Sequence, residues 1–391
     1  MKLPRNLPDR RRVAVLGSTG SIVVSTLEVA AALPERVEIV ALCAHSNWRR
    51  LFEQTHQFKP RWAVLTDPAA HARADQSLLW HGTRLLGGED GVAAIVRDSD
   101  VDIVVSAIVG AAGLRGTWGA LDAGKCVALA NKESLVVAGP LIMKLAREKG
   151  NGLLPVDSEH SGLFQALLAG KVGEVERLVL TGSGGPFRGK TARELEHVTP
   201  EEALRHPTWQ MGKKITVDSA TLMNKALEMI EARWLFDLPP ERLDILIHPK
   251  SLVHALVEFR DGSVLAQLSP PDMKLPIQYA LTWPDRVSGP AKRLDWGTLR
   301  ELRFEPPDRE AFPSVQFGYE VAARGGTCGA VLNAANEAAV DRFLTGTLRF
   351  LDIPRVCRQI LDAHPFSPTP GLDELLVLDG WARQEVARWN P

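Results

Sequence analysis

Short runs of apolar, mostly β-branched residues recur along the first 156 positions and alternate with longer amphipathic stretches. The runs read VAVLG, VEIVALC, RWAVL, VDIVVSAIV, CVALA and LLPV. Continuous apolar runs are typical of strands buried on both faces, as in a parallel sheet covered by helices. Residues 1–156 are therefore predicted to form a doubly wound, Rossmann-like α/β domain.

The pattern changes after this point. Glycine-rich loops, one long helix near 219–236 and alternating strands such as SLVHALVEF and SVLAQL predict an α+β domain over 157–285. Prolines are frequent and periodicity is weak over 286–312, as in a linker. Helical spacing returns in GAVLNAANEAAVDRFL, so 313–391 is predicted to form a small helical bundle.

Composition narrows the class of protein. The 391 residues are too many for one ordinary core, and 45% hydrophobic with 24% charged residues is the balance of a globular protein. A net charge of -1 gives no overall attraction to nucleic acid or anionic lipid. No apolar run reaches the roughly 18 residues of a membrane span. Four dispersed cysteines indicate neither zinc nor a disulfide framework, so we expect a cytoplasmic protein without nucleic-acid or membrane partners.

The segment VAVLGSTGSIVVSTLEVA predicts a strand, a glycine turn and a helix, the arrangement that binds a pyrophosphate at a helix N-terminus. Gly17 and Gly20 would permit the turn and bring backbone amides to the phosphate. The second strand ends in CAHSNWRR, where an NAD enzyme usually offers a carboxylate to the ribose. Neutral and basic groups favour NADPH, although Arg49 and Arg50 could equally form a solvated helix face.

Three carboxylates are candidate ligands of a divalent metal. In LLPVDSEH, Asp157 and Glu159 are two residues apart, so in an extended segment both would point to one side. On a helix beginning near Asp218, Glu228 would share a flank with Asn224 and Lys225. All-oxygen ligands favour Mg²⁺ or Mn²⁺ over zinc. Taken alone, Glu228 would more often form an ordinary surface salt bridge.

Three further segments have compositions suited to a ligand site. TGSGGPFRG would leave backbone amides and Ser183 free for a phosphate. RHPTWQMGKK places His206 and an aromatic residue before Gly212, which suggests a lid, although a plain loop explains it equally well. LANKESLVVAG follows the fifth predicted strand, where doubly wound sheets bind ligands, and the alternative there is a simple polar loop.

Taken in order, GSTGSI, ANKESLV, LLPVDSEH, TGSGGPF, HPTWQMG, VDSATLMNKALE, IHPKSLVH, PDM and LNAANE closely resemble the motifs of the 1-deoxy-D-xylulose 5-phosphate reductoisomerase family. The resemblance covers nearly the whole chain. It implies a homodimeric enzyme of the methylerythritol phosphate route to isoprenoid precursors. Such an enzyme uses NADPH and Mg²⁺ or Mn²⁺ to rearrange and reduce 1-deoxy-D-xylulose 5-phosphate to 2-C-methyl-D-erythritol 4-phosphate. Val23 stands where the family usually has glycine, and Ser46 where a basic residue is frequent.

The resemblance also implies roles for single residues. The metal ligands would be Asp157, Glu159 and Glu228, and the catalytic set would be these three with Lys132 and His206. The substrate would be held by Lys132, Ser158, Glu159, Ser183, His206, Ser219, Asn224, Lys225 and Glu228. The cofactor would be lined by Thr19, Gly20, Ser21, Ile22, His45, Ser46, Asn47, Asn131, Glu133 and Gly212.

Two other functions remain open at this point. A metal-dependent sugar-phosphate aldolase or isomerase would use the same carboxylates without net redox chemistry. A nucleotide-sensing regulatory protein would need only the first domain, and it would leave the three carboxylates unexplained.

Overall fold

The computed structural model describes residues 7–18, 20–150 and 152–390, and its contacts divide the chain into two compact units. The first unit contains the described residues up to Asn131 together with Ile142–Ser161 and Asp272–Lys292. The second contains Lys132–Leu141, Gly162–Pro271 and the described residues from Arg293 onward. The domain boundaries predicted at 156, 285 and 312 divide the chain into consecutive segments. The contacts instead assign Asp272–Lys292, which comes late in the sequence, to the first unit.

A seven-stranded parallel sheet forms the centre of the first unit, in the order β4-β3-β2-β1-β5-β6-β7. Its strands are β1 (Arg11–Leu16), β2 (Val37–Ala44), β3 (Trp62–Leu65), β4 (Arg84–Gly87), β5 (Ile103–Ser106), β6 (Cys126–Leu129) and β7 (Leu153–Pro155). The Rossmann-like prediction is confirmed. Only β4 was not predicted, because this short, partly exposed edge strand lacks a buried apolar run.

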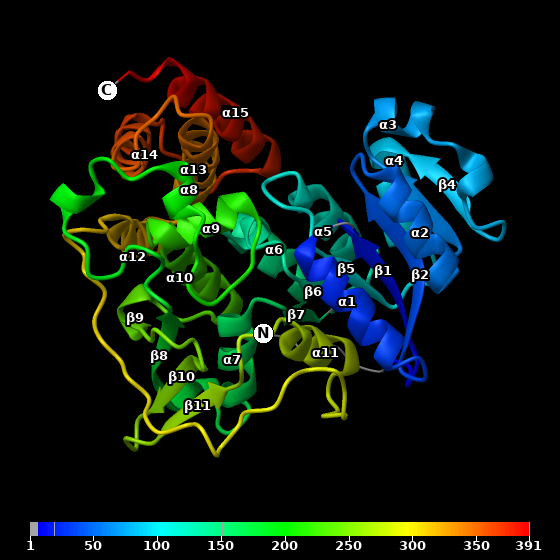
Figure 1. Cartoon of the computed structure of the whole chain (residues 1–391), viewed down its shortest axis with the longest axis horizontal. Coiled ribbons are helices and arrows are strands. Elements are labelled where there is room, and N and C mark those ends of the chain that lie inside the picture. The colour runs from blue at the N-terminus through cyan, green and yellow to red at the C-terminus, as the bar shows by residue number, and fades with distance from the viewer. Residues whose placement is uncertain (1–6, 19, 151, 391) are drawn as a thin grey trace. The chain divides into compact units, whose positions relative to one another are not determined.

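Helices cover both faces of this sheet. α1 (Ser21–Ala32) and α2 (Trp48–Phe58) connect strands that succeed one another from β1 toward β3, and α3 (Pro68–Arg73) follows. α4 (Gly88–Arg97) lies between β4 and β5, and α5 (Gly113–Asp122) lies between β5 and β6, so both belong to connections that lead toward the opposite edge of the sheet. Right-handed crossovers therefore place the two pairs on opposite faces, and Figure 1 shows α1 and α2 in front. The order reverses between β1 and β5, which is where such sheets bind ligands.

Two helices carry the chain from one unit into the other. α6 (Glu133–Lys149) is kinked at Ala138, just before Pro140, and the division between the units falls after Leu141. α7 (Ser158–Leu167) crosses from the first unit to the second after Ser161.

α11 (Lys274–Thr282) packs on α1 in the first unit.

The second unit combines a four-stranded sheet with helices. Its strands, in the order β11-β10-β8-β9, are β8 (Val175–Gly182), β9 (Leu243–Ile247), β10 (Val253–Phe259) and β11 (Val264–Leu268). The helices are α8 (Pro200–Ala203), α9 (Lys213–Ala220), α10 (Met223–Phe236), α12 (Ser314–Arg324), α13 (Cys328–Leu344), α14 (Asp352–Ala363) and α15 (Leu372–Arg388). The α+β and helical predictions are confirmed. Within the described part of the chain, no helix has the length and apolar character needed to cross a membrane.

The long helix predicted near 219–236 corresponds to α10, but it begins at Met223 rather than near 219. A separate helix, α9, ends at Ala220, and Leu222 between α9 and α10 has a left-handed backbone with a φ of 57°. Apolar spacing continues across the break, so the sequence pattern could not reveal it. α9 ends at Ala220 and α10 begins at Met223, so Ser219 and Asn224 each lie one residue from a helix end.

Candidate active site

The turn between β1 and α1 is built around Gly17. Its φ is 93°, and a Cβ at this position would lie 2.7 Å from the carbonyl oxygen of Ala107, so the turn requires glycine. The amides of Gly17 and Ser18 donate to the Cys43 carbonyl at 2.8 and 2.6 Å, which ties the turn to the end of β2. Gly20 is the N-cap of α1 and supplies no side-chain cap, which suits this helix end to a phosphate.

Of the other residues expected in this turn, Ser21 and Ile22 open α1, whereas Thr19 lies outside the described residues. The end of β2 is neutral and basic, as expected from the sequence. Asn47 is the N-cap of α2 and accepts the Arg50 amide at 3.2 Å. Nδ1 of His45 lies 2.9 Å from the Thr66 hydroxyl. Ser46, which lies between His45 and Asn47 in the sequence, is exposed.

The two basic residues that follow are engaged in local contacts. Arg49 stacks on the Trp48 ring at 4.4 Å, and Arg50 pairs with Glu53 at 2.9 Å. These contacts agree with the alternative that the two arginines belong to a solvated helix face. A 2′-phosphate at the end of β2 would still meet no carboxylate within residues 45–50.

Asn131 ties together the loops that follow β5 and β6. Its buried side-chain amide donates to the carbonyl oxygens of Ile108 and Gly110 at 2.7 and 2.9 Å. Both loops leave the carboxyl ends of neighbouring parallel strands, beside the point where the strand order reverses. Asn131 therefore shapes the edge where this fold binds ligands.

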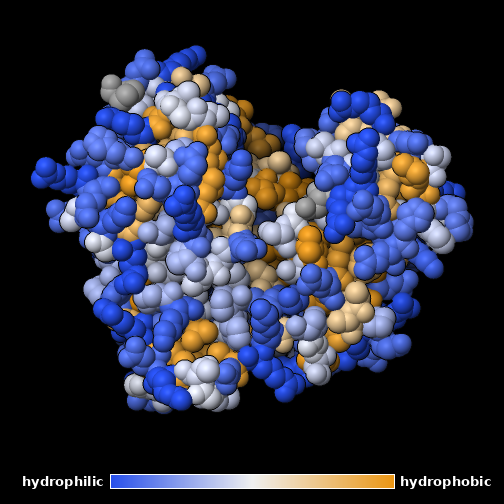
Figure 2. All heavy atoms as spheres, viewed as in Figure 1, coloured by the Kyte–Doolittle hydropathy of each residue, from blue (hydrophilic) through white to orange (hydrophobic). Residues whose placement is uncertain are grey.

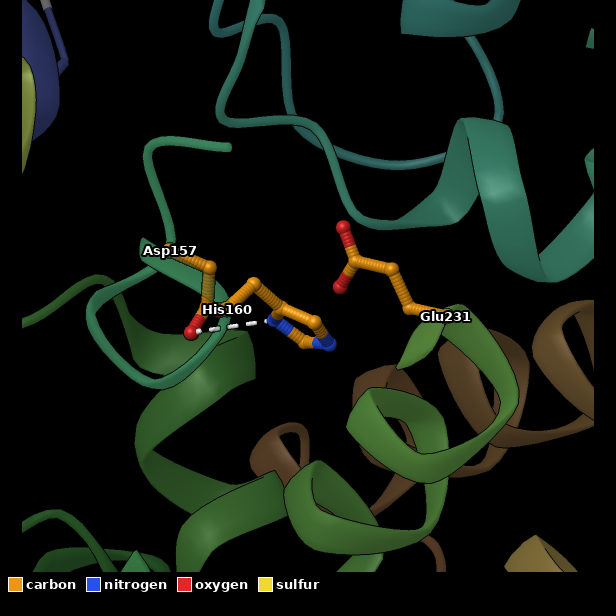
Figure 3. Close-up of side chains that lie close together, drawn as sticks. All are labelled: Asp157, His160 and Glu231. Carbon is orange, nitrogen blue, oxygen red and sulfur yellow. Dashed lines mark ion pairs between the residues drawn. The ribbon is translucent and has the colours of Figure 1, made fainter. Parts of the chain in front are cut away.

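Asp157 and Glu159 do not lie in an extended segment. β7 ends at Pro155 and α7 begins at Ser158, so the argument from strand alternation is wrong. The Glu159 amide donates to Oδ1 of Asp157 at 3.3 Å, and the Ser158 hydroxyl donates to Oε2 of Glu159 at 2.5 Å. Figure 3 shows Asp157 and His160 pointing toward each other, with Oδ1 and Nδ1 3.5 Å apart. The start of α7 thus gathers two carboxylates and an imidazole.

In the second unit, Glu228 on α10 receives three donors. Nζ of Lys132 lies 3.3 Å from Oε1 of Glu228 and 2.6 Å from Oδ1 of Asn224. The Asn224 amide and the Lys225 ammonium also donate to Glu228, and Lys225 donates to the Thr181 carbonyl at 2.8 Å. Glu228 is only 1% exposed, so it is not a surface salt bridge. The two ammonium groups compensate a carboxylate that burial alone would penalise.

His206 lies between two serines that were predicted to bind substrate. Its Nε2 is 3.0 Å from the Ser183 hydroxyl and 3.1 Å from the Ser219 hydroxyl. Its Nδ1 accepts the amides of Thr208 and Trp209 at 3.2 and 2.9 Å, so in the neutral ring the proton resides on Nε2. The ring thereby fixes the orientation of both serine hydroxyls.

The glycine-rich loop approaches α9 closely at Gly185. This residue has a φ of 70°, and a Cβ on it would lie 2.5 Å from the Ser219 carbonyl oxygen. The Gly185 amide donates to the Ser183 hydroxyl at 3.1 Å. Gly212 is the N-cap of α9, and Glu133 at the start of α6 pairs with Lys214 at 3.4 Å.

The pH dependence of stability should report the environment of His206. Burial, and secondarily the charge of Lys225, lower its pKa from 6.5 to about 4. Between these values the unfolded chain binds a proton that the folded chain does not, so the free energy of unfolding should fall as pH decreases from 6.5 toward 4. Urea titrations over this range should show a smaller loss for His206→Asn than for the unmodified protein. Parallel curves would contradict this assignment.

The described contacts thus form separate groups. Lys132, Asn224, Lys225 and Glu228 form one, and Ser183, His206 and Ser219 form another, both within the second unit. Potential metal-ligating side chains are Asp157, Glu159 and His160 in the first unit and Glu228 and Glu231 in the second. His160 and Glu231 were not predicted from sequence, although each follows a predicted ligand by three residues. For Glu228 and Glu231 on α10 this is the spacing of one helix face, whereas Asp157 directly precedes α7. The three-carboxylate site and the cofactor lining draw on both units and stay predictions.

Comparison with known proteins gives a consistent result over the whole chain. A family model described as 1-deoxy-D-xylulose 5-phosphate reductoisomerase matches residues 13–139. Models of that enzyme's C-terminal domain match residues 153–236 and 268–385. The chain is 49% identical to the reductoisomerase of Laribacter hongkongensis over 381 residues, covering 96% of this chain and 98% of the relative. It is likewise 49% identical to that of Heliobacterium modesticaldum over 376 residues, covering 96% of each chain.

Solved structures agree. The reductoisomerase of Zymomonas mobilis in complex with NADPH has a TM-score of 0.90 and 42% identity, covering 97% of this chain and 98% of the other. A reductoisomerase in complex with NADPH, fosmidomycin and magnesium has a TM-score of 0.91 and 39% identity, with the same coverage. Since sequence and fold agree over nearly the full length of these proteins, the chain belongs to the 1-deoxy-D-xylulose 5-phosphate reductoisomerase family.

Proposed function

We propose that this chain converts 1-deoxy-D-xylulose 5-phosphate to 2-C-methyl-D-erythritol 4-phosphate with NADPH and a divalent metal ion. The observation that carries the proposal is the buried Glu228 between Lys132 and Lys225. The charge of Lys225 also acts on His206, the ring that orients the two serine hydroxyls. An acidic metal ligand beside cationic and hydroxyl donors suits a substrate with both chelating oxygens and a phosphate.

The metal ligands in this proposal are Asp157, Glu159 and Glu228. Their donors are all carboxylate oxygens, which fits Mg²⁺ or Mn²⁺. When bound, the ion would act as a Lewis acid on the carbonyl and hydroxyl oxygens of the substrate while its carbon–carbon bonds rearrange. NADPH would supply the hydride that reduces the aldehyde formed by this rearrangement. Lys132, which donates to both Asn224 and Glu228, fixes the direction of these two side chains.

The phosphate would be held by the serine hydroxyls. Ser183 accepts the Gly185 amide and lies 3.0 Å from Nε2 of His206, so its own proton can point to a phosphate oxygen. Ser219 contributes a second hydroxyl, and Lys225 contributes positive charge. The loop over residues 205–212 joins α8 to α9, and its closure would exclude water from the site.

A direct assay tests this function. The protein with 1-deoxy-D-xylulose 5-phosphate, NADPH and Mg²⁺ or Mn²⁺ should oxidise the nicotinamide, as followed by its absorbance. Omission of either the metal or the substrate should abolish the signal. An aldolase or isomerase without redox chemistry would consume substrate with no change in absorbance, which would overturn the proposal.

The enzyme should prefer NADPH to NADH clearly. Residues 45–50 contain no carboxylate to repel the 2′-phosphate, and the usual acidic partner of the NADH ribose is missing. We expect kcat/KM to be at least about tenfold higher with NADPH, because one phosphate contact to a charged or polar group contributes about 1.5–3 kcal/mol. Steady-state kinetics with both cofactors would check this, and equal efficiencies would contradict it.

Val23→Gly tests the position at which the family usually has glycine. The Val23 side chain is completely buried in the first turn of α1. The substitution should therefore lower the free energy of unfolding by roughly 2–4 kcal/mol, measured in urea. If the valine also holds α1 away from β1, the KM for NADPH should decrease. An unchanged KM would show that this valine does not affect the cofactor.

A homodimer is part of the proposal, and β11 is its proposed contact. This strand lies at the edge of its sheet, and Val264 and Leu265 on it are 52% and 39% exposed. Figure 2 shows an apolar area over the β10–β11 hairpin at the lower left. An exposed apolar edge favours pairing with another chain. Sedimentation should give twice the chain mass for the unmodified protein and a shift toward monomer for Val264→Lys.

The cytoplasm is the proposed location. All four cysteines, Cys43, Cys126, Cys328 and Cys357, are free and buried. Free thiols persist in a reducing compartment. Fractionation of cells that express the protein would test this.

A further inference from the structure

The LNAANE motif on α13 has no role in the function proposed above. Within it, Asn336 is fully buried and its amide donates to Oδ1 of Asp218 at 2.8 Å. Asp218 is itself 1% exposed and directly precedes Ser219 on α9. A buried carboxylate with a side-chain partner on another helix fixes the relative placement of the two helices at that point.

The contacts continue from Asp218 through Lys214. Nζ of Lys214 lies 2.8 Å from Oδ2 of Asp218, four residues further along the same helix, and 3.4 Å from Oε1 of Glu133. Burial alone would lower the pKa of Lys214, but the charges of Asp218 and then Glu133 raise it above its usual value. The chain Asn336, Asp218, Lys214, Glu133 therefore alternates hydrogen-bond donors and acceptors without a break.

This chain joins α13 to residues of the proposed site. α9 spans only eight residues, Lys213–Ala220, and its N-cap Gly212 gives it no side-chain cap. α13 spans 17 residues, and most of them are buried against other helices. A short helix without such a cap needs outside contacts to hold its position, since isolated helices of this length are unstable. α13 is thus the fixed partner, and α9 is the element that it holds.

We propose that Asn336, Asp218 and Lys214 are positioning residues, through which the buried helix α13 sets the placement of Ser219 at the phosphate and of Glu133 near the cofactor. The inference rests on the proposed function for the roles of Ser219 and Glu133. It adds that α13, which contributes no expected ligand of its own, controls substrate affinity. Loss of the Asn336–Asp218 bond should therefore raise the KM for the substrate more than it lowers kcat.

Exchanging the amide and the carboxylate between positions 336 and 218 gives the sharpest test. Asn336→Asp would set two buried carboxylates against each other and should raise the substrate KM roughly 10- to 100-fold, with kcat changed by less than about threefold. Adding Asp218→Asn in the same protein reverses the bond: the new amide at position 218 donates to position 336 and its oxygen accepts from Lys214. The double variant should recover a KM within about threefold of the unmodified protein. Failure of the swap to recover affinity would overturn the proposal.

Asn333→Asp is the matched control. Asn333 is buried on the same helix and its amide donates to a carboxylate, Oε1 of Glu337, at 3.0 Å. Glu337 pairs with Arg383 on α15 at 2.5 Å, and its charge reaches Lys214 on α9 only as a smaller contribution than those of Asp218 and Glu133. The control should lose stability without a change in substrate KM. An equal rise in KM for both single variants would reduce the role of Asn336 to general stability and contradict the proposal.

Direct binding separates this inference from the proposed function. Affinity for inorganic phosphate, measured by calorimetry, should fall with Asn336→Asp and return in the double variant. If the unmodified protein shows no turnover, the proposed function fails, and phosphate affinity still decides the inference. If Asn336→Asp does not fold, Asn336→Ala replaces it, because alanine removes the donor to Asp218 without adding a second buried carboxylate. Unchanged phosphate affinity in that variant would contradict the inference.

Discussion

Replacing Glu228 with glutamine should reduce turnover by about 1000-fold or more while NADPH binding changes little. The amide keeps the shape and one oxygen of the side chain but removes the charge that a divalent ion needs. It also leaves the ammonium groups of Lys132 and Lys225 without their shared carboxylate. Mn²⁺ affinity, measured by electron paramagnetic resonance, should fall together with the rate.

The control for this variant is Glu320→Gln. Glu320 is also a salt-bridged carboxylate of the second unit, but its partners are Arg324 and Arg358 on α12 and α14. Its replacement should leave both turnover and Mn²⁺ affinity unchanged. Near-normal, metal-dependent activity of Glu228→Gln would show that Glu228 is not a metal ligand.

Lys225→Met should have the next largest effect, raising the substrate KM roughly 100-fold through the loss of charge at the phosphate. The sequence predicted an effect mainly on substrate affinity. The structure adds that the Lys225 ammonium donates to Glu228 and to the Thr181 carbonyl, so kcat and stability should also fall. Removal of this charge should raise the pKa of His206 from about 4, which nuclear magnetic resonance titration can follow.

Lys190→Met provides a comparison in the neighbouring loop. Its ammonium lies 5.2 Å from the Phe187 ring centroid and has no role in the proposed site. Kinetics and the His206 pKa should be unaffected there. If Lys225→Met changed only kcat and left the substrate KM intact, Lys225 would act through Glu228 alone rather than on the phosphate.

The sequence alone determined the features that depend on near neighbours along the chain. The parallel sheet could be predicted because each strand buried on both faces is itself a continuous apolar run. The turn at Gly17 and the contact of Asn224 with Glu228 follow from local spacing. The order of motifs is likewise a property of the sequence. The comparisons confirmed the family resemblance that this order indicates.

Tertiary structure decided the features in which a local pattern admits several outcomes. Asp157 and Glu159 were expected in an extended segment, but the chain becomes helical at Ser158. Over so few residues, the spacing of apolar positions does not distinguish a strand from the first turn of a helix. Leu222 breaks a helix whose spacing continues on both sides. The short edge strand β4 has too little burial to leave a pattern.

The site itself shows the same division. Sequence supplied the residue types: carboxylates, a lysine pair, serines and a histidine. It could not show that His206 lies between Ser183 and Ser219, or that Asn336 reaches Asp218 from 118 positions away. Such contacts depend on how distant segments pack, because hydrogen bonds between buried side chains form only where packing brings a donor and an acceptor within about 3 Å.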